Sequence, residues 1–147
     1  MTVYLLYIQN TIDIPTWKLI LLLVISADIG AGVIANFTKG TNSHYSQKSK
    51  RKSRLVFILS HFIHPAIFLY TLNLFSTKTI VFVVLLIIST LIINAIKNKE
   101  KQKIIASFCL LSGIGILLIL EMSNPLLLWF FPLFMIKLFI AFGIRRY

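Results

Sequence analysis

Two histidines lie three residues apart inside an apolar run of this chain. His61 and His64 belong to the stretch ILSHFIHPAIF, residues 58–68, and Pro65 follows them directly. Residues at i and i+3 share one face of a helix, so both imidazoles are expected on the same side. Proline cannot donate to the carbonyl four residues earlier, so the His61 carbonyl is left free and a kink is expected. One helix would therefore offer two imidazoles and a loose carbonyl at one level.

An acidic residue lies at a similar depth in another apolar run, in the stretch SADIGAGVIAN. Asp28 comes eleven residues after Trp17 and nine before Phe37, and His64 comes nine residues after Leu55. At 1.5 Å per residue, Asp28 lies about 16 Å from one end of its helix and His64 about 13–14 Å from the end of its own. If the two helices are antiparallel neighbours, Asp28 and His64 meet near the bilayer midplane. An ionisable side chain there costs about 2.5–3.5 kcal/mol and normally faces the protein interior.

These side chains support three interpretations. Because histidine titrates near neutral pH, a carboxylate beside an imidazole suits a proton relay or a small-ligand site, with Asn36 on the same helix row as Asp28. His61, His64 and Asp28 are also three candidate ligands for zinc or another transition metal, with a fourth position left for water. A membrane metalloenzyme with a lipid-like substrate would need a general base, and no second carboxylate is evident at that depth. The third interpretation is a structural hydrogen-bond cluster between two helices.

The composition is that of an integral membrane protein. Of the 147 residues, 58% are hydrophobic and 13% are charged, against about 25% charged in globular proteins. The mean hydropathy is +0.89. The formal charge is +11, but the basic residues fall between long apolar runs, so the expected partner is the bilayer and not nucleic acid. The single cysteine, Cys109, excludes an internal disulfide.

Five apolar segments are long enough to cross a bilayer as helices. A hydrocarbon core of about 30 Å needs about 20 mainly apolar residues, and these runs lack the alternation of barrel strands. We therefore predict an all-α integral membrane protein, a bundle of five transmembrane helices in one domain over residues 1–147. The expected spans are residues 17–37, 55–75, 79–96, 104–120 and 125–144. In the tripeptide SNP, Ser123 or Asn124 is expected to cap the fifth helix, with Pro125 in its first position.

The basic residues between the spans predict the orientation. With the first connection in the cytoplasm, twelve Lys and Arg residues fall on that side and two, Lys18 and Lys78, on the other. The twelve are Lys39, Lys48, Lys50, Arg51, Lys52, Arg54, Lys97, Lys99, Lys101, Lys103, Arg145 and Arg146. Such a bias places the N-terminus outside and the C-terminus in the cytoplasm. Lys137, inside the fifth span, is expected to extend to the inner interface.

Function is open among three classes at this stage. The first is a small protein of proton- or ion-linked transport or small-ligand binding, which would need a homo-oligomer to form a pathway because five helices show no repeat. The second is the metalloenzyme described above, and a non-enzyme is favoured over it. The third is a non-catalytic membrane protein: an assembly or immunity partner of another membrane protein, or a holin-like protein. Anionic lipids are expected at the basic loop Lys48–Arg54. The Ile-, Lys- and Asn-rich composition suggests a bacterial plasma membrane.

Overall fold

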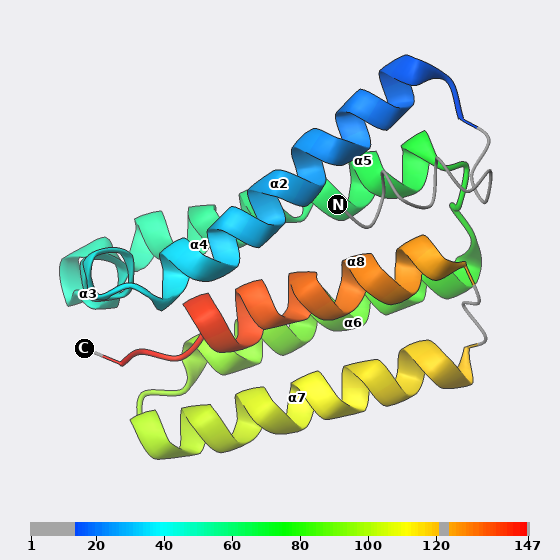
Figure 1. Cartoon of the computed structure of the whole chain (residues 1–147). Helices are drawn as coiled ribbons and strands as arrows, with labels where there is room; N and C mark the ends of the chain where they lie inside the picture. Colours follow the sequence, from blue (N-terminus) through cyan, green and yellow to red (C-terminus); the bar gives the residue numbers. More distant parts are fainter. Residues whose placement is uncertain (1–13, 121–123, 147) are drawn as a thin grey trace.

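Helices make up most of the chain in the computed structural model, which describes residues 14–120 and 124–146 (Figure 1). This part of the chain contains no strand, so the all-α prediction is confirmed. The helices are α2 (Thr16–Phe37), α3 (Lys39–Ser46), η1 (Lys48–Lys50), α4 (Arg51–His61), α5 (Ile63–Thr71), α6 (Thr77–Ala95), α7 (Lys99–Ile119), α8 (Pro125–Met135) and η2 (Ile136–Phe142). The short η1 is a 3-10 helix, and η2 is a π-helix that continues α8.

Five of these helical stretches are long and apolar enough to cross a membrane. They are Thr16–Phe37, Arg51–Thr71, Thr77–Ala95, Lys99–Ile119 and Pro125–Phe142. The second and fourth begin at residues 51 and 99 instead of the predicted 55 and 104. Their first turns are rich in Lys and Arg, which are good helix formers, so the helices extend beyond their apolar parts.

The second stretch also ends earlier than predicted, at Thr71. Asn73 adopts a left-handed conformation with φ of 54°, and the Leu74 N–H donates to the Leu69 carbonyl at 2.9 Å. A left-handed residue followed by this backward hydrogen bond is the Schellman motif that closes many helices. Ser76 then caps α6, with its side chain accepting from the Thr79 N–H. The chain therefore turns between α5 and α6 within a few residues.

The start of α8 is as the sequence predicts. The Asn124 side chain accepts a hydrogen bond from the Leu126 N–H at 2.9 Å, and Pro125 occupies the first helical position. That position has no intrahelical N–H bond to lose, so the proline stabilises the start of the helix. The predicted cap at Asn124 is confirmed.

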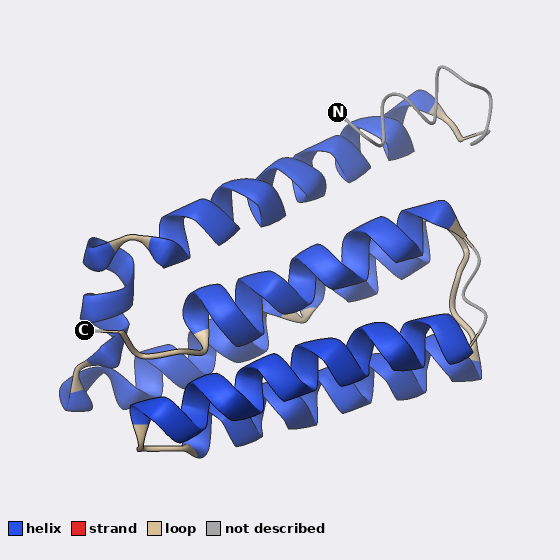
Figure 2. Ribbon diagram, turned by 60° about the horizontal axis from the view of Figure 1, so that its bottom comes forward, coloured by secondary structure: helices blue, strands red, loops and turns tan. Residues whose placement is uncertain are grey.

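The last apolar stretch is the centre of the bundle. Over α8 and η2, 61% of the residues are buried, against 22–33% in the apolar parts of the other four stretches. Five phenylalanines of this stretch are fully buried: Phe130, Phe131, Phe134, Phe139 and Phe142. Figures 1 and 2 show α8 between α2 on one side and the α6–α7 hairpin on the other, with α2 along one edge of the molecule.

The basic connections lie together at one end of the bundle. Figure 1 shows α3, the α6–α7 turn and the segment after η2 at this end, with the α5–α6 turn and the start of α2 at the other. We call the first the basic end, formed by residues 38–54, 96–103 and 143–146. The long polar connection is itself folded there: Asn42 of α3 is buried, its amide donates to the Ile144 carbonyl at 2.9 Å, and its oxygen accepts from the Arg146 N–H at 2.9 Å.

Candidate functional site

Asp28 and His64 are in direct contact between α2 and α5. Asp28 Oδ2 lies 3.0 Å from His64 Nε2, so the level pairing expected from the two helix lengths is present. The other ring nitrogen, His64 Nδ1, lies 2.9 Å from the His61 carbonyl oxygen. That carbonyl is the one Pro65 leaves free, and the helix is interrupted beside it, at Phe62 between α4 and α5. The predicted break and its freed carbonyl therefore create one of the two contacts that hold the His64 ring.

Lys137 completes the cluster, and its predicted position at the inner interface is wrong. Its side chain is 2% exposed, and its Nζ lies 2.7 Å from Asp28 Oδ2 and 3.4 Å from the Asp28 carbonyl oxygen. A buried ammonium needs a partner of opposite charge. Asp28 supplies it, and this pairing outweighs the option of extending toward the interface.

A π-helix and a glycine place the Lys137 side chain. Pro132 lies inside α8, where it cannot donate to the carbonyl four residues before it. The helix continues as a π-helix from Ile136, so Lys137 lies in wider turns that present a different face from an α-helix. Opposite it, a Cβ on Gly32 of α2 would lie 2.6 Å from Lys137 Nζ. A side chain at position 32 would therefore push the Lys137 ammonium out of this place.

This geometry predicts opposite outcomes for two neighbouring glycines of α2. Gly32→Ala should displace Lys137, loosen its contact with Asp28 and lower the thermal unfolding temperature in detergent. Gly30→Ala is the matched control, since nothing lies within 4 Å of the added Cβ. Because alanine is the better helix former, it should be neutral or stabilise by up to about 1 kcal/mol. Equal stabilisation by both changes would contradict the close packing of Lys137 on Gly32.

His61 lies beside the cluster but does not contact Asp28. Its Nδ1 lies 2.6 Å from the Phe57 carbonyl oxygen, and its ring packs on Phe57 with centroids 4.0 Å apart. The His61 and His64 ring centroids are 5.3 Å apart. Together the two rings line the α4–α5 break, with only His64 directed at the carboxylate.

The three predicted metal ligands, His61, His64 and Asp28, do not form a metal-binding group. Within residues 14–120 and 124–146, no set of three or more His, Cys, Asp or Glu side chains is placed to hold a metal ion. The physical reason is charge: the Lys137 ammonium already neutralises Asp28 Oδ2, the one carboxylate of the three candidate ligands. A dication would have to displace that ammonium.

Asn36, the remaining candidate, is buried away from the cluster. It is 3% exposed, and its Nδ2 has no hydrogen-bond partner in the described part of the chain. It lies two helical turns after Asp28 on the same row of α2, and no hydrogen bond joins the two side chains. The structure therefore does not bring Asn36 into the Asp28–His64 contact.

A second buried cation, missed in the sequence, closes the basic end. Arg54 is 2% exposed, and its Nη2 donates to the carbonyls of Phe142 and Gly143 at 2.8 and 2.9 Å. Its Nε donates to Asn94 Oδ1 at 2.6 Å. The last carbonyls of a helix lack intrahelical partners and carry partial negative charge. Arg54 thus caps the end of η2 and does not face the lipid, which corrects its expected place in the basic loop.

One signal in the sequence could have identified Lys137. Among the predicted spans, Asp28 and Lys137 are the only acidic and the only basic residue more than one residue from a span end. Lys137 lies seven residues before Ile144, or about 10 Å from the end of its predicted span. Asp28 lies nine residues before Phe37, which ends its own span on the same side, so the depths of Lys137 and Asp28 differ by less than one helical turn. A charge pair at equal depth was therefore predictable. No comparable signal marks Arg54, since its carbonyl partners depend on how the helices pack.

No protein-family model, curated protein or solved structure matches this chain. Its class is defined by the fold and the cluster. Its described residues are all-helical, with five helices long and apolar enough to span a membrane, and an ionic cluster joins α2, α5 and η2.

Proposed function

We propose that this chain is a polytopic membrane protein whose Asp28–His64 pair takes up and releases a proton, in proton- or ion-linked transport or small-ligand binding. One observation carries the proposal. Both ring nitrogens of His64 face oxygens: the His61 carbonyl, which only accepts, at 2.9 Å, and Asp28 Oδ2, which accepts when ionised, at 3.0 Å.

The proton count follows from that geometry. A neutral imidazole carries one N–H, so either tautomer leaves one nitrogen lone pair against an oxygen lone pair. With Asp28 ionised, both contacts are hydrogen bonds only when His64 is an imidazolium. Both contacts are also hydrogen bonds when the Asp28 carboxyl is protonated and donates to Nε2 of a neutral His64. In the proposed function, the pair holds one proton more than a neutral histidine beside a carboxylate when both contacts are hydrogen bonds.

The surroundings support exchange of that proton. Four titratable groups gather here from four elements: Asp28 from α2, His64 from α5 and Lys137 from η2 in direct contact, and His61 from α4 beside His64. The Asp28 and His64 side chains are 52% and 24% exposed, whereas Lys137 is 2% exposed. Lys137 can then act as a fixed counter-charge, and the partly exposed Asp28 and His64 exchange the proton where a hydrated path reaches them. Ionisable groups at this depth commonly serve proton pathways.

Proton flux into liposomes tests this function. Purified protein reconstituted with an internal pH dye should acidify the lumen faster than protein-free liposomes when a pH gradient and a membrane potential are imposed. His64→Asn should reduce the flux to the protein-free rate while the helical circular dichroism is retained. His44→Asn is the matched control, because His44 lies exposed on α3, and its flux should be unchanged. Flux that His64→Asn leaves intact would refute the proposal. Wild-type protein with no flux would favour a structural cluster.

We also propose an orientation of the chain in the membrane. The N-terminus outside, the basic end in the cytoplasm and a bacterial plasma membrane are supported by the gathering of Lys and Arg at one end. Alkaline phosphatase fused after Lys97 should then be inactive, and active after Phe75; the reverse pattern would invert the topology. Because Arg54 is buried, we expect anionic lipid to contact the exposed residues of the basic loop, such as Arg51 and Lys52.

We also propose that the protein forms a homo-oligomer. The Asp28 side chain is half exposed at a depth where lipid solvates a carboxylate poorly. A second copy could enclose a hydrated path to it. Light scattering of the detergent-solubilised protein should give a mass above that of one chain, and a monomer would remove this part of the proposal.

A further inference from the structure

A small apolar groove with a charged rim lies on the α6–α7 hairpin at the basic end. It has a volume of about 210 Å³ and is lined by Ile96, Lys101, Ile104 and Ile105. Ile104 is 67% exposed, so the groove opens on the outside of the bundle. Three isoleucines thus meet one lysine where the apolar part of α7 gives way to its charged first turns.

Ile96 links this groove to a positively charged group. Its carbonyl accepts a hydrogen bond from Arg145 Nη1 at 3.2 Å, and Arg145 Nη2 donates to the Asn94 carbonyl at 2.6 Å. The guanidinium is therefore held at the end of α6, next to the residue that lines the groove. Burial and, second, the neighbouring Arg51 lower the pKa of Arg145. A further cation near Arg145 raises the local positive potential, which favours an anion there.

Acidic side chains do not neutralise this end of the chain. Glu100 is the one acidic residue in segments 38–54, 96–103 and 143–146, and it pairs with Lys103 at 2.8 Å. Lys101 makes no ion pair in the described part of the chain. The positive charge at the rim is thus available to an external anion.

We propose that this groove binds one anionic phospholipid, with an acyl chain along Ile96, Ile104 and Ile105 and its phosphate near Lys101 and Arg145. Basic pockets beside the cytoplasmic ends of membrane helices are suited to anionic headgroups. A free phosphate would not use the isoleucines, and a zwitterionic lipid would not neutralise the rim. This inference goes beyond proton exchange at Asp28 and does not depend on it.

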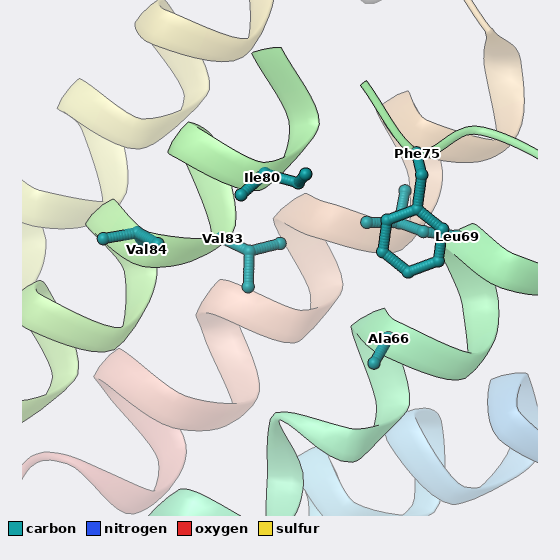
Figure 3. A pocket seen from close by; sticks show the side chains of 6 residues that line it. All are labelled: Ala66, Leu69, Phe75, Ile80, Val83 and Val84. Carbon is teal, nitrogen blue, oxygen red and sulfur yellow. The ribbon is translucent and has the colours of Figure 1, made fainter. Parts of the chain in front are cut away.

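A second groove offers an internal contrast. It has about 150 Å³ and lies between α5 and α6 near the opposite end, lined by Ala66, Leu69, Phe75, Ile80, Val83 and Val84 (Figure 3). None of these side chains is charged. This second groove should accept acyl chains without regard to the headgroup, whereas the first should select a negative one.

Lipid titration of the purified full-length protein tests the site. Native mass spectrometry in detergent should show saturable binding of phosphatidylglycerol and weaker, non-saturating binding of phosphatidylcholine. Lys101→Gln should weaken phosphatidylglycerol binding about fivefold, the effect of one cation near a membrane surface. Ile104→Asn should also weaken it, and glycerol phosphate, which lacks acyl chains, should not compete.

The matched control is Lys39→Gln, which removes the same charge from an exposed residue of α3 at the same end. Phosphatidylglycerol binding should be unchanged in this variant. Equal losses in Lys39→Gln and Lys101→Gln would overturn the site in favour of diffuse attraction to the basic end. Equal binding of the two lipids, or strong competition by glycerol phosphate, would also overturn it. None of these results depends on proton flux, so this proposal and the proposed function can fail separately.

Discussion

Asp28→Asn is expected to destabilise the protein by about 3 kcal/mol, because it leaves a buried cation without its partner. Lys137 is 2% exposed and its ammonium lies 2.7 Å from Asp28 Oδ2. Asparagine keeps the shape of the side chain but cannot neutralise that charge. Reversible unfolding in detergent, followed by circular dichroism, would measure the loss of stability.

Lys137→Met should cost less, about 1 kcal/mol, and the double variant should recover most of the stability. Methionine fills the buried space of the lysine stem, and the remaining Asp28 carboxylate is half exposed and still contacts His64. Under the proposed function water reaches that carboxylate, so it tolerates the loss of Lys137 better than Lys137 tolerates the loss of Asp28. If Lys137→Met costs as much as Asp28→Asn, the open side of Asp28 is dry, which contradicts a hydrated path. Simple additivity in the double variant would show that the two charges are not coupled.

Arg54→Leu is expected to cost about 3 kcal/mol by removing three hydrogen bonds from one buried guanidinium. The carbonyls of Phe142 and Gly143 and the side-chain oxygen of Asn94 would lose their donor. Leucine retains apolar volume but cannot cap the end of η2. Since η2 carries Lys137, the loss at the basic end should also make the π-helical stretch less stable. Thermal unfolding and hydrogen exchange of the amides of residues 136–143 would measure both effects.

Arg51→Leu provides the control for this prediction. Arg51 is exposed at the start of α4, three residues before Arg54 on the same helix. Substitutions at such surface positions usually change stability by no more than about 0.5 kcal/mol. If the two leucine variants unfold alike, the capping role of Arg54 would be contradicted.

Part of the candidate site follows from local sequence alone. Proline at position 65 removes one backbone hydrogen bond, which accounts for the free His61 carbonyl and the break at Phe62. The depth of Asp28 and His64 follows from the constant rise of a helix and the ends of two apolar runs. Both features are local or depend on length, so the level contact between Asp28 and His64 was predictable. The cap at Asn124 is local in the same way.

The ends of the second stretch were predicted less well because apolar length was the criterion used. The start at Arg51 and the end at Thr71 depend on helix propensity and on a left-handed asparagine at position 73. These are also local signals, and turn chemistry would have identified the second of them. Both ends of this helix were therefore predictable from local sequence signals, which the length of the apolar run does not include.

The sequence by itself determined the all-helical class, the five apolar stretches, the gathering of basic residues and the depth of Asp28 and His64. These depend on composition, periodicity and the rise per residue, all of which can be counted along the chain. Only the tertiary structure decided that Lys137 turns inward to Asp28 and that Arg54 caps η2. Depth along a helix is additive from residue to residue, but the direction of a side chain around it depends on the π-helical turns and on Gly32. Which carbonyls a guanidinium reaches depends on how α4, α6 and η2 pack, and that packing is settled by contacts between residues far apart in the chain.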